Sequence, residues 1–348
     1  MANNRGEKLR MQVLSCALKS GRIVFSGFLV LLAIAWIAAP AHAKSPYNKN
    51  SAAKKHAAKN KTAAKHVDKK KKSRPANQGI QAKAVYCVNL KSNETVLSRN
   101  ADQQLPVASL TKLVTAMVAL DHMPLDKKVA VPEHIKKIPK SVVGLKAGDE
   151  LTVENLLHGL LIGSGNDCAE TIACAFPGGK EKFVTAMNKK VRAMGMRKTR
   201  FFTPSGLDQK NDGASENEVD EDSNVSTARE IGAIAREAFS NATIRSVCLK
   251  KAHVLEGAND HTYPVRTTNK LLRDNLPLVG GKTGYTSRAG HCLATEFTPG
   301  RNAFLIVVLG SPNHFRDTRL VYHKALKDAT KIKLTPHDQL AKRIASQN

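Results

Sequence analysis

A serine and a lysine three residues apart, Ser109 and Lys112, are the first pair of side chains in this chain that could do chemistry together. They open a segment in which apolar residues such as Val114 and Met117 recur near helical spacing, and Pro124 ends that pattern. Residues three apart on a helix share a face, so the hydroxyl and the ε-amine can meet. The pair could therefore act as a nucleophile and its general base.

The same Ser-x-x-Lys pattern also occurs at Ser51 and Lys54, inside a low-complexity tract, so the pattern alone is weak. Two further motifs strengthen it, because Ser-Gly-Asn at 164–166 and Lys-Thr-Gly at 282–284 follow in chain order. A lysine with an ordinary pKa of ~10.4 is a poor base at neutral pH. Lowering that pKa by about three units costs on the order of 4 kcal/mol, for which burial, a helix N-terminus and Lys282 are plausible sources. We therefore predict a substantially neutral Lys112.

The elements that must position these motifs can be read from local patterns. A hairpin is expected over 85–90 and 95–98, and helices from Ser109, from an N-cap at Thr152, over 183–194 and from a capping box at 227–230. Strands are expected over 278–285, 291–297 and 303–309, followed by a helix over 314–329. Strands at both ends of the folded region with helices between them predict one α/β (α+β) domain, in which the N-terminal hairpin completes an antiparallel sheet.

The formal net charge of +26 is spread unevenly along the 348 residues. Five Lys or Arg against one Glu give residues 1–22 a charge of +4, and eleven Lys and Arg74 against Asp68 give residues 44–74 a charge of +11. The apolar run 23–39 behind a basic flank, with Ala-His-Ala at 41–43, predicts a signal peptide over 1–43. An uncleaved single-span anchor is the alternative, and either way the remainder is expected to be exported, to the periplasm or the exterior of the envelope.

Residues 44–78 are rich in Lys and Ala and have almost no large apolar residue, so we expect a disordered basic linker. It would be either a solvated spacer or an electrostatic contact to anionic envelope material, and export disfavours nucleic acid as a partner. The folded domain is expected over 79–332, with a short tail over 333–348. The acidic stretch 208–222 could bind a metal but fits a solvated surface loop better.

Cysteine and histidine usage points to no cofactor and no metal site. Five cysteines follow the leader, and an odd number leaves at least one thiol without an internal partner. Cys168 and Cys174 are six residues apart on an expected helix, hence on different faces, so a mutual disulfide is not expected. Several of the five lie in apolar segments, which predicts mostly buried and inert thiols. The histidines are scattered without a ligand-pair motif.

Residues 80–330 resemble the D-alanyl-D-alanine carboxypeptidase family of low-molecular-mass penicillin-binding proteins. The resemblance rests on seven segments that span the folded region in order: 108–112 (Ala-Ser-Leu-Thr-Lys), 145–149 (Leu-Lys-Ala-Gly-Asp), 162–167 (Ile-Gly-Ser-Gly-Asn-Asp), 205–207 (Ser-Gly-Leu), 226–229 (Ser-Thr-Ala-Arg), 268–272 (Thr-Asn-Lys-Leu-Leu) and 281–286 (Gly-Lys-Thr-Gly-Tyr-Thr). It implies the penicillin-binding protein transpeptidase and β-lactamase fold, an antiparallel sheet flanked by helices with a helical subdomain.

The resemblance also implies an activity and a set of roles. The enzyme would be a penicillin-sensitive serine carboxypeptidase that removes the terminal D-Ala of peptidoglycan stem peptides, with β-lactams as covalent inhibitors. Ser109 would be the nucleophile, Lys112 the base and Ser164 the proton donor to the leaving amine. The substrate would be held by Asn166, Lys282, Thr283 and Gly284, and the backbone N–H groups of Ser109 and Tyr285 would form the oxyanion hole.

Several departures from the family pattern bear on the activity. Gly165 stands where class A β-lactamases have Asp, and no Glu-x-x-Leu-Asn segment follows Ser164, so efficient penicillin hydrolysis is not expected. Gly-Ser-Pro-Asn at 310–313 occupies the place where some members have an arginine that receives the substrate carboxylate. Since the sequence stops at Asn348, we expect neither the additional β-domain nor the C-terminal amphipathic anchor of longer relatives.

Two alternatives to the carboxypeptidase therefore stay open. One is a DD-endopeptidase that cuts peptidoglycan cross-links with the same residues, which the missing arginine favours. The other is a non-catalytic envelope-binding protein that works through its basic segment, and the intact Ser109, Lys112, Ser164 and Lys282 count against it.

Overall fold

The computed structural model describes residues 79–139, 141–208, 223–258 and 260–332. The predicted signal peptide, the basic linker, nearly all of the acidic stretch 208–222 and the C-terminal tail lie outside these residues.

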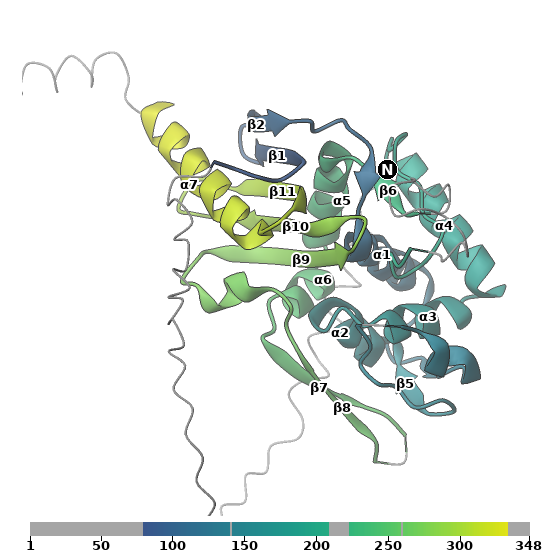
Figure 1. Ribbon diagram of the computed structural model, residues 1–348. Helices are drawn as coiled ribbons and strands as arrows, with labels where there is room; N and C mark the ends of the chain where they lie inside the picture. The colour runs from purple at the N-terminus through teal and green to yellow at the C-terminus, as the bar shows by residue number, and fades with distance from the viewer. Residues whose placement is uncertain (1–78, 140, 209–222, 259, 333–348) are drawn as a thin grey trace, which may run out of the picture. The chain divides into compact units, whose positions relative to one another are not determined.

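A five-stranded antiparallel sheet has the order β2-β1-β11-β10-β9. The N-terminal hairpin supplies β1 (Ala84–Asn89) and β2 (Thr95–Arg99), and the C-terminal third supplies β9 (Leu278–Thr286), β10 (Gly290–Phe297) and β11 (Phe304–Ser311). β1 pairs with β11, so the two ends of the domain meet in the centre of the sheet (Figure 1). The prediction that the N-terminal hairpin completes the sheet is confirmed.

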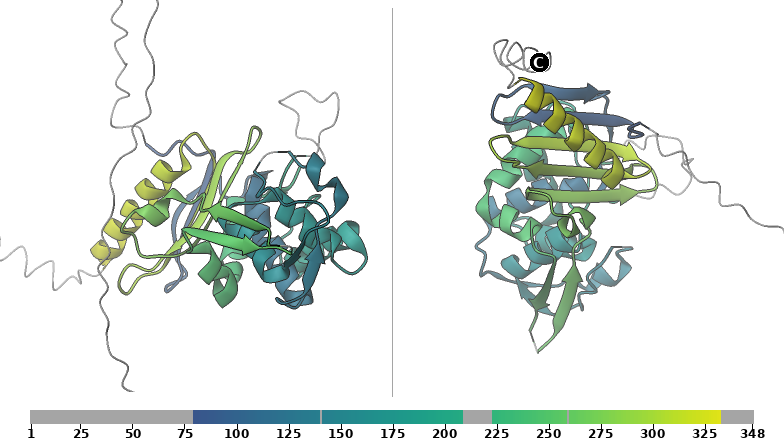
Figure 2. Two further views of the ribbon diagram at one scale, coloured as in Figure 1. Left: turned by 90° about the horizontal axis from the view of Figure 1, so that it is seen from below. Right: turned by 90° about the vertical axis from the view of Figure 1, so that its left-hand side faces the viewer.

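Both faces of the sheet are buried, because residues of opposite parity along a strand enter different cores. On β11, Leu305 and Val307 pack into the main core, whereas Ile306 and Val308 pack into a second core beneath α7 (His314–Ile332). The main-core face is covered by α5 (Ala228–Ser240) and α6 (Ala242–Cys248), so that the sheet lies between helical layers (Figures 1 and 2).

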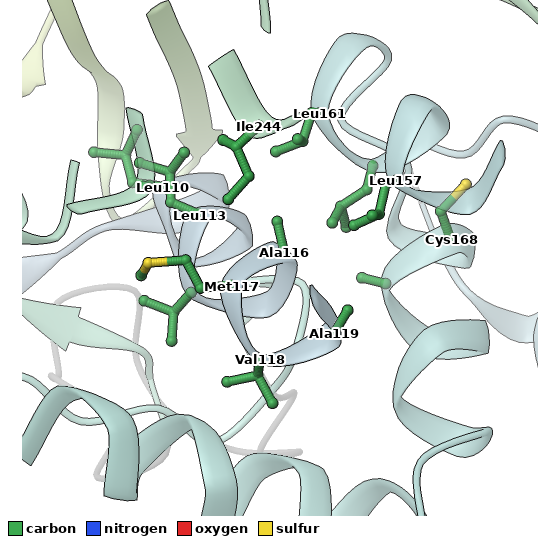
Figure 3. Packing of buried hydrophobic residues seen from close by; sticks show 14 of the residues in the cluster. Leu110, Leu113, Ala116, Met117, Val118, Ala119, Leu157, Leu161, Cys168 and Ile244 are labelled. Carbon is green, nitrogen blue, oxygen red and sulfur yellow. The ribbon is translucent and has the colours of Figure 1, made fainter. Parts of the chain in front are cut away.

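The second part of the domain is helical and packs around α1 (Lys112–His122). Apolar side chains of α1 point outward in several directions and are buried by α2 (Val153–Ile162), α3 (Asn166–Cys174), α4 (Gly179–Ala193) and α6 (Figure 3). A helix surrounded in this way is held rigidly. Its first residue, Lys112, is therefore a fixed point of the fold.

Short elements complete the architecture. Three two-stranded pairs are formed by β3 (Leu105–Pro106) with β6 (Val225–Ser226), β4 (Lys128–Ala130) with β5 (Glu150–Thr152), and β7 (Ala252–Glu256) with β8 (Thr262–Arg266). Three 3-10 helices are η1 (Ala108–Thr111), η2 (Glu133–Lys137) and η3 (Lys270–Arg273).

The predicted helix caps are confirmed in part. Thr152 Oγ1 accepts from Asn155 N at 3.1 Å, and Thr227 Oγ1 accepts from Glu230 N at 3.0 Å. The Glu230 carboxylate accepts from the backbone N–H groups of Arg197 and Lys198, so it pins a neighbouring loop to α5. The Glu230 carboxylate is therefore used for this loop rather than for a reciprocal capping box, in which it would accept from Thr227 N.

Other differences concern where elements begin. The segment at Ser109 starts as the 3-10 helix η1 before α1, and α4 begins at Gly179 rather than at Phe183. α6 and the β7–β8 hairpin were not predicted. α6 is only 7 residues long, which is too short for a clear helical period, and Pro264 inside β8 weakens the strand pattern of the hairpin.

The five cysteines of the described region are free thiols, four of them buried, as predicted. Among the described residues, none of the helices combines the length and the apolarity that crossing a membrane requires.

Candidate active site

Ser109 and Lys112 meet at the junction of η1 and α1, with Lys112 Nζ 2.8 Å from Ser109 Oγ. The 3-10 turn sets this distance, since it brings residues three apart onto one line. Ala108 precedes the serine with φ +47°, a left-handed conformation that an alanine rarely adopts. Such strain is typical of functional sites, where the surrounding structure enforces it.

Lys112 is fully buried, and its amine faces three oxygens: Ser109 Oγ, Asn166 Oδ1 at 2.7 Å and the Ser205 carbonyl at 2.7 Å. Burial lowers the pKa of Lys112 well below its ordinary value, and the nearby charge of Lys282 lowers it further. This agrees with the neutral amine predicted from sequence. A neutral amine can donate its two N–H groups to the Asn166 and Ser205 oxygens, which only accept, and so keeps its lone pair for the hydroxyl of Ser109.

Ser164 and Lys282 form a second pair, with Lys282 Nζ 2.8 Å from Ser164 Oγ and 2.8 Å from the Thr283 carbonyl. Ser164 has φ +60° in the turn between α2 and α3, another strained position next to the candidate chemistry. Burial lowers the pKa of Lys282 to about 8, so a large fraction of this amine still carries a proton at neutral pH.

Strand β9 places the remaining predicted residues at the edge of the sheet. A Cβ on Gly284 would lie 3.0 Å from Ser109 N and 3.2 Å from the Val107 carbonyl, tighter than most Cβ contacts, so glycine lets β9 approach η1 this closely without displacing that backbone. Thr283 Oγ1 lies 2.6 Å from Thr268 Oγ1, which fixes the hydroxyl beside the strand. Tyr285 follows and is 59% exposed.

Asn166 and Asp167 join the candidate site to the segment that follows η2. The Asp167 carboxylate accepts from three successive backbone N–H groups, those of residues 143, 144 and 145, at 3.0, 2.8 and 3.2 Å. Asn166 N donates to the Ser141 carbonyl at 2.8 Å. The first turn of α3, which carries the amide that faces Lys112, is thus held by a surrounding loop.

Asn224 and Gly206 hold the turn 203–207 against η1. The Asn224 amide accepts from the N–H groups of Phe202 and Thr203 and donates to Thr111 Oγ1 at 3.0 Å. Gly206 has φ +80°, and a Cβ there would collide with the Ala108 carbonyl. This contact brings the Ser205 carbonyl to Lys112.

The structure therefore collects Ser109, Lys112, Ser164, Asn166 and Lys282 into one connected group. Sequence reasoning missed the Ser205 carbonyl and the Thr268 hydroxyl, although both lie in segments that carry the family resemblance. A backbone carbonyl has no residue-type signal, and a threonine beside a strand is common. The predicted role of Asn166 in holding a substrate amide stays a prediction, since its Oδ1 faces Lys112 here.

This arrangement can carry out acyl transfer. A serine hydroxyl faces a buried amine with a lowered pKa, and a second serine is hydrogen-bonded to a lysine that retains much of its charge. The close approach of Gly284 to Ser109 N places the backbone of β9 beside that of Ser109, as a pair of oxyanion N–H donors requires.

Comparison with known proteins also points to a family of serine peptidases. The profile of the D-alanyl-D-alanine carboxypeptidase family, peptidase S11, matches residues 69–313. A D-alanyl-D-alanine endopeptidase of Escherichia coli is 32% identical over 245 residues (68% of this chain, 75% of that protein), and one of Pseudomonas aeruginosa is 33% identical over 257 residues (71% and 78%). D-alanyl-D-alanine carboxypeptidase DacF of Bacillus subtilis is 28% identical over 236 residues (66% and 58%).

Solved structures agree in fold. The Streptomyces K15 DD-transpeptidase superposes with a TM-score of 0.65 at 27% identity, covering 72% of this chain and 98% of the other. The match to the family over most of the described domain, together with the geometry around Ser109, leads to one conclusion. The chain belongs to the D-alanyl-D-alanine carboxypeptidase family of serine peptidases, peptidase S11.

Proposed function

We propose that this chain is a serine DD-endopeptidase that hydrolyses D-alanyl cross-links between peptidoglycan stem peptides through an acyl-enzyme on Ser109. The observation that carries the reaction class is the chain of contacts from Ser109 through Lys112 to Asn166, with Ser164 on Lys282 across the site. The S11 family membership is in keeping with it.

In the proposed mechanism Ser109 Oγ attacks the D-Ala carbonyl while Lys112 takes the hydroxyl proton. The backbone N–H groups of Ser109 and Tyr285 stabilise the oxyanion. The C–N bond then breaks, Ser164 passes a proton to the leaving amine, and protonated Lys282 replaces that proton. Before the second half of the cycle, Lys112 must give the proton it took from Ser109 back to Lys282, by way of Ser164 or solvent, so that both amines return to their starting states. Neutral Lys112 can then take a proton from the water that hydrolyses the ester.

Two observations favour the endopeptidase over the carboxypeptidase that the sequence placed first. The relatives named endopeptidases combine 32% and 33% identity with 245 and 257 aligned residues, whereas the carboxypeptidase DacB2 of Mycobacterium tuberculosis is 32% identical over only 221 residues and DacF is 28% identical over 236. At the end of β11, where an arginine would receive a terminal carboxylate, the buried Ser311 donates to Asp317 Oδ2 at 2.7 Å. That position therefore offers no cation to bind a terminal carboxylate. A cross-linked substrate does not require such a cation there.

We also propose that the enzyme acts outside the cytoplasmic membrane, in the periplasm or on the envelope exterior, since its substrate is there and the leader predicts export. β-Lactams are proposed as covalent inhibitors because they imitate the D-Ala-D-Ala acyl donor.

The test compares a cross-linked muropeptide dimer with a pentapeptide monomer, using mass spectrometry of the products. We expect the dimer to be cleaved at least about tenfold faster than D-Ala is released, a difference on the order of 1.4 kcal/mol in the barrier. Ser109→Ala should abolish both reactions and also the one-penicillin adduct seen by intact mass with benzylpenicillin.

Faster release of D-Ala from the pentapeptide would replace this proposal by the carboxypeptidase. If the purified protein neither forms an adduct nor cleaves either substrate, the non-catalytic envelope-binding alternative takes its place.

A further inference from the structure

A group of three metal-binding side chains lies apart from the Ser109 group, where η2 contacts α3. His134 Nε2 is 3.1 Å from Glu170 Oε1, and Cys174 Sγ is 4.0 Å from the same oxygen. The three ligand atoms all lie within 4.8 Å of one another. One carboxylate oxygen is thus flanked by an imidazole nitrogen and a thiol.

The fold brings these side chains together in two ways. Glu170 and Cys174 are four residues apart on α3 and so share one helix face. His134 comes from η2, and the loop after η2 is anchored to the start of α3 by Asp167. The group therefore rests on elements whose relative position is fixed by other contacts.

The geometry and the ligand types both fit zinc. Bond lengths of about 2.0–2.3 Å to N, O and S in a tetrahedral site put ligand atoms roughly 3.3–3.7 Å from one another. The two separations from Glu170 Oε1, 3.1 Å and 4.0 Å, bracket this range, and all three ligand atoms lie within 4.8 Å of one another, so side-chain shifts of about 1 Å would complete the coordination. A thiolate, an imidazole and a carboxylate are a mixed set that favours a borderline ion such as Zn²⁺ over Mg²⁺ or Ca²⁺.

We propose that His134, Glu170 and Cys174 form a binding site for a divalent transition metal ion, for which zinc is the best fit. On binding, the Cys174 thiol gives its proton to solvent, and the thiolate, the imidazole nitrogen and a Glu170 oxygen each donate an electron pair to the ion. Water fills the fourth position.

Lys180 is the competitor for this site. Its amine lies 2.8 Å from Glu170 Oε1, and the Glu170 side chain is only 6% exposed, so Lys180 balances a buried negative charge. The Lys180 side chain is itself 35% exposed and can turn to solvent when a cation takes its place. Metal and lysine therefore exclude each other at Glu170.

A bound metal ion would make the region beside the candidate active site more rigid. The ion would tie η2 to α3, whose first residue is Asn166, and Asn166 N donates to the Ser141 carbonyl in the loop after η2. We expect the ion to raise thermal stability, because a ligand that binds only the folded state stabilises that state. The proposal does not depend on which bond the enzyme cleaves.

The experiment is a calorimetric titration of the metal-stripped, purified full chain with Zn²⁺. We expect one strong site that Cys174→Ser and His134→Gln each weaken by at least about tenfold, as the loss of a ligand should. Histidines in residues 1–78 are the same in every variant, so zinc bound there does not contribute to the difference. Since His134 is half exposed, His134→Gln should fold even if Cys174→Ser does not.

Two further variants separate a metal site from an ordinary ion pair. Lys180→Gln should bind Zn²⁺ more tightly, because the competing cation is gone, while Lys182→Gln, two residues along the same helix, should bind as the parent does. With Co²⁺, a sulfur-to-metal charge-transfer band should appear in the parent and in Cys87→Ala, and should be absent in Cys174→Ser.

Equal Zn²⁺ affinity in the parent, Cys174→Ser and His134→Gln would overturn the proposal. So would weaker Zn²⁺ binding in Lys180→Gln than in Lys182→Gln, because Lys180 would then support the site rather than compete for it.

Discussion

Lys112 is the residue on which the proposed chemistry turns. Its amine has no exposure to solvent and faces three oxygens, two of which can only accept hydrogen bonds. A charged amine there loses its hydration, so burial favours the neutral form that can accept the proton of Ser109. Lys282 has the opposite task, because it must keep a proton to support Ser164.

These opposite needs predict a bell-shaped pH dependence for acylation by a fluorescent penicillin. The rate should rise with pH as Lys112 loses its proton, through a pKa that burial holds well below the ordinary lysine value. It should fall above about 8, where Lys282 loses its proton. The measurement is the second-order acylation rate constant in buffers across this range.

Two arginine variants test which lysine causes the rise and which the fall of the rate with pH. Lys112→Arg should slow acylation by at least about a hundredfold at every pH, because a guanidinium cannot act as a base. Lys282→Arg should keep its charge and lose the fall at high pH. A Lys112→Arg enzyme within about tenfold of the parent would show that another group takes the serine proton.

At the scale of elements, the candidate site depends on close backbone approaches that bring distant segments together. Gly284 lets β9 approach η1, and Gly206 lets the turn 203–207 reach the Ala108 carbonyl. In each case the neighbour is backbone, which cannot rotate away as a side chain can. The spacing of these elements is thus set by glycines rather than by large side chains.

Gly206→Ala and Gly195→Ala form a matched pair that tests this. Both glycines have left-handed φ values, +80° and +83°, but a Cβ meets nothing within 4 Å at Gly195. Gly195→Ala should therefore lower the free energy of unfolding by about 1 kcal/mol from backbone strain alone. Gly206→Ala should lower it further, since the Ala108 carbonyl must move.

The Gly206→Ala and Gly195→Ala variants should also differ in their rate of acylation. Gly206→Ala should slow penicillin acylation by at least about tenfold, because a shift on the order of 1 Å at a reacting group can cost even more than that, and Gly195→Ala should leave it unchanged. Chemical denaturation and acylation kinetics give the two readings. Equal losses in both variants would mean that the contact at Ala108 does not position Ser109.

At the scale of the whole molecule, positive charge is densest in residues 44–74, which precede the described domain. Residues 44–74 have a net charge of +11 out of +26 for the chain. Clustered lysines bind anionic surfaces with about 1 kcal/mol for each residue near the surface, and salt screens this attraction. We propose that this segment holds the enzyme near anionic envelope material.

Deletion of residues 44–74 tests that idea. We expect the deletion to lower binding to vesicles with anionic lipid at least about tenfold at about 0.1 M salt, and binding by the parent to weaken steeply by about 1 M. Cleavage of a soluble muropeptide should be unchanged. Sedimentation with vesicles, with neutral vesicles as the control, gives the comparison, and undiminished binding after the deletion would contradict the proposal.

Much of the fold could be predicted because its signals are local. The strands of the central sheet and most of the helices follow from apolar periodicity and from capping threonines such as Thr152 and Thr227, which act within one turn of the chain. α6 was not predicted because 7 residues show no clear helical period, and the β7–β8 hairpin was not predicted because Pro264 interrupts the pattern of β8. The start of α4 was misplaced because its first residues, from Gly179 on, carry no cap signal.

The sequence by itself determined which side chains are candidates for chemistry, because residue type and the order of three motifs are properties of the chain. Only the tertiary structure decided how they pair, since the contacts of Lys112 with Asn166 and with the Ser205 carbonyl join positions 54 and 93 residues apart, and that of Lys282 with Ser164 spans 118. It likewise decided that His134 meets Glu170 and Cys174. Such contacts depend on how the buried faces of separate elements pack, and no local pattern encodes that packing.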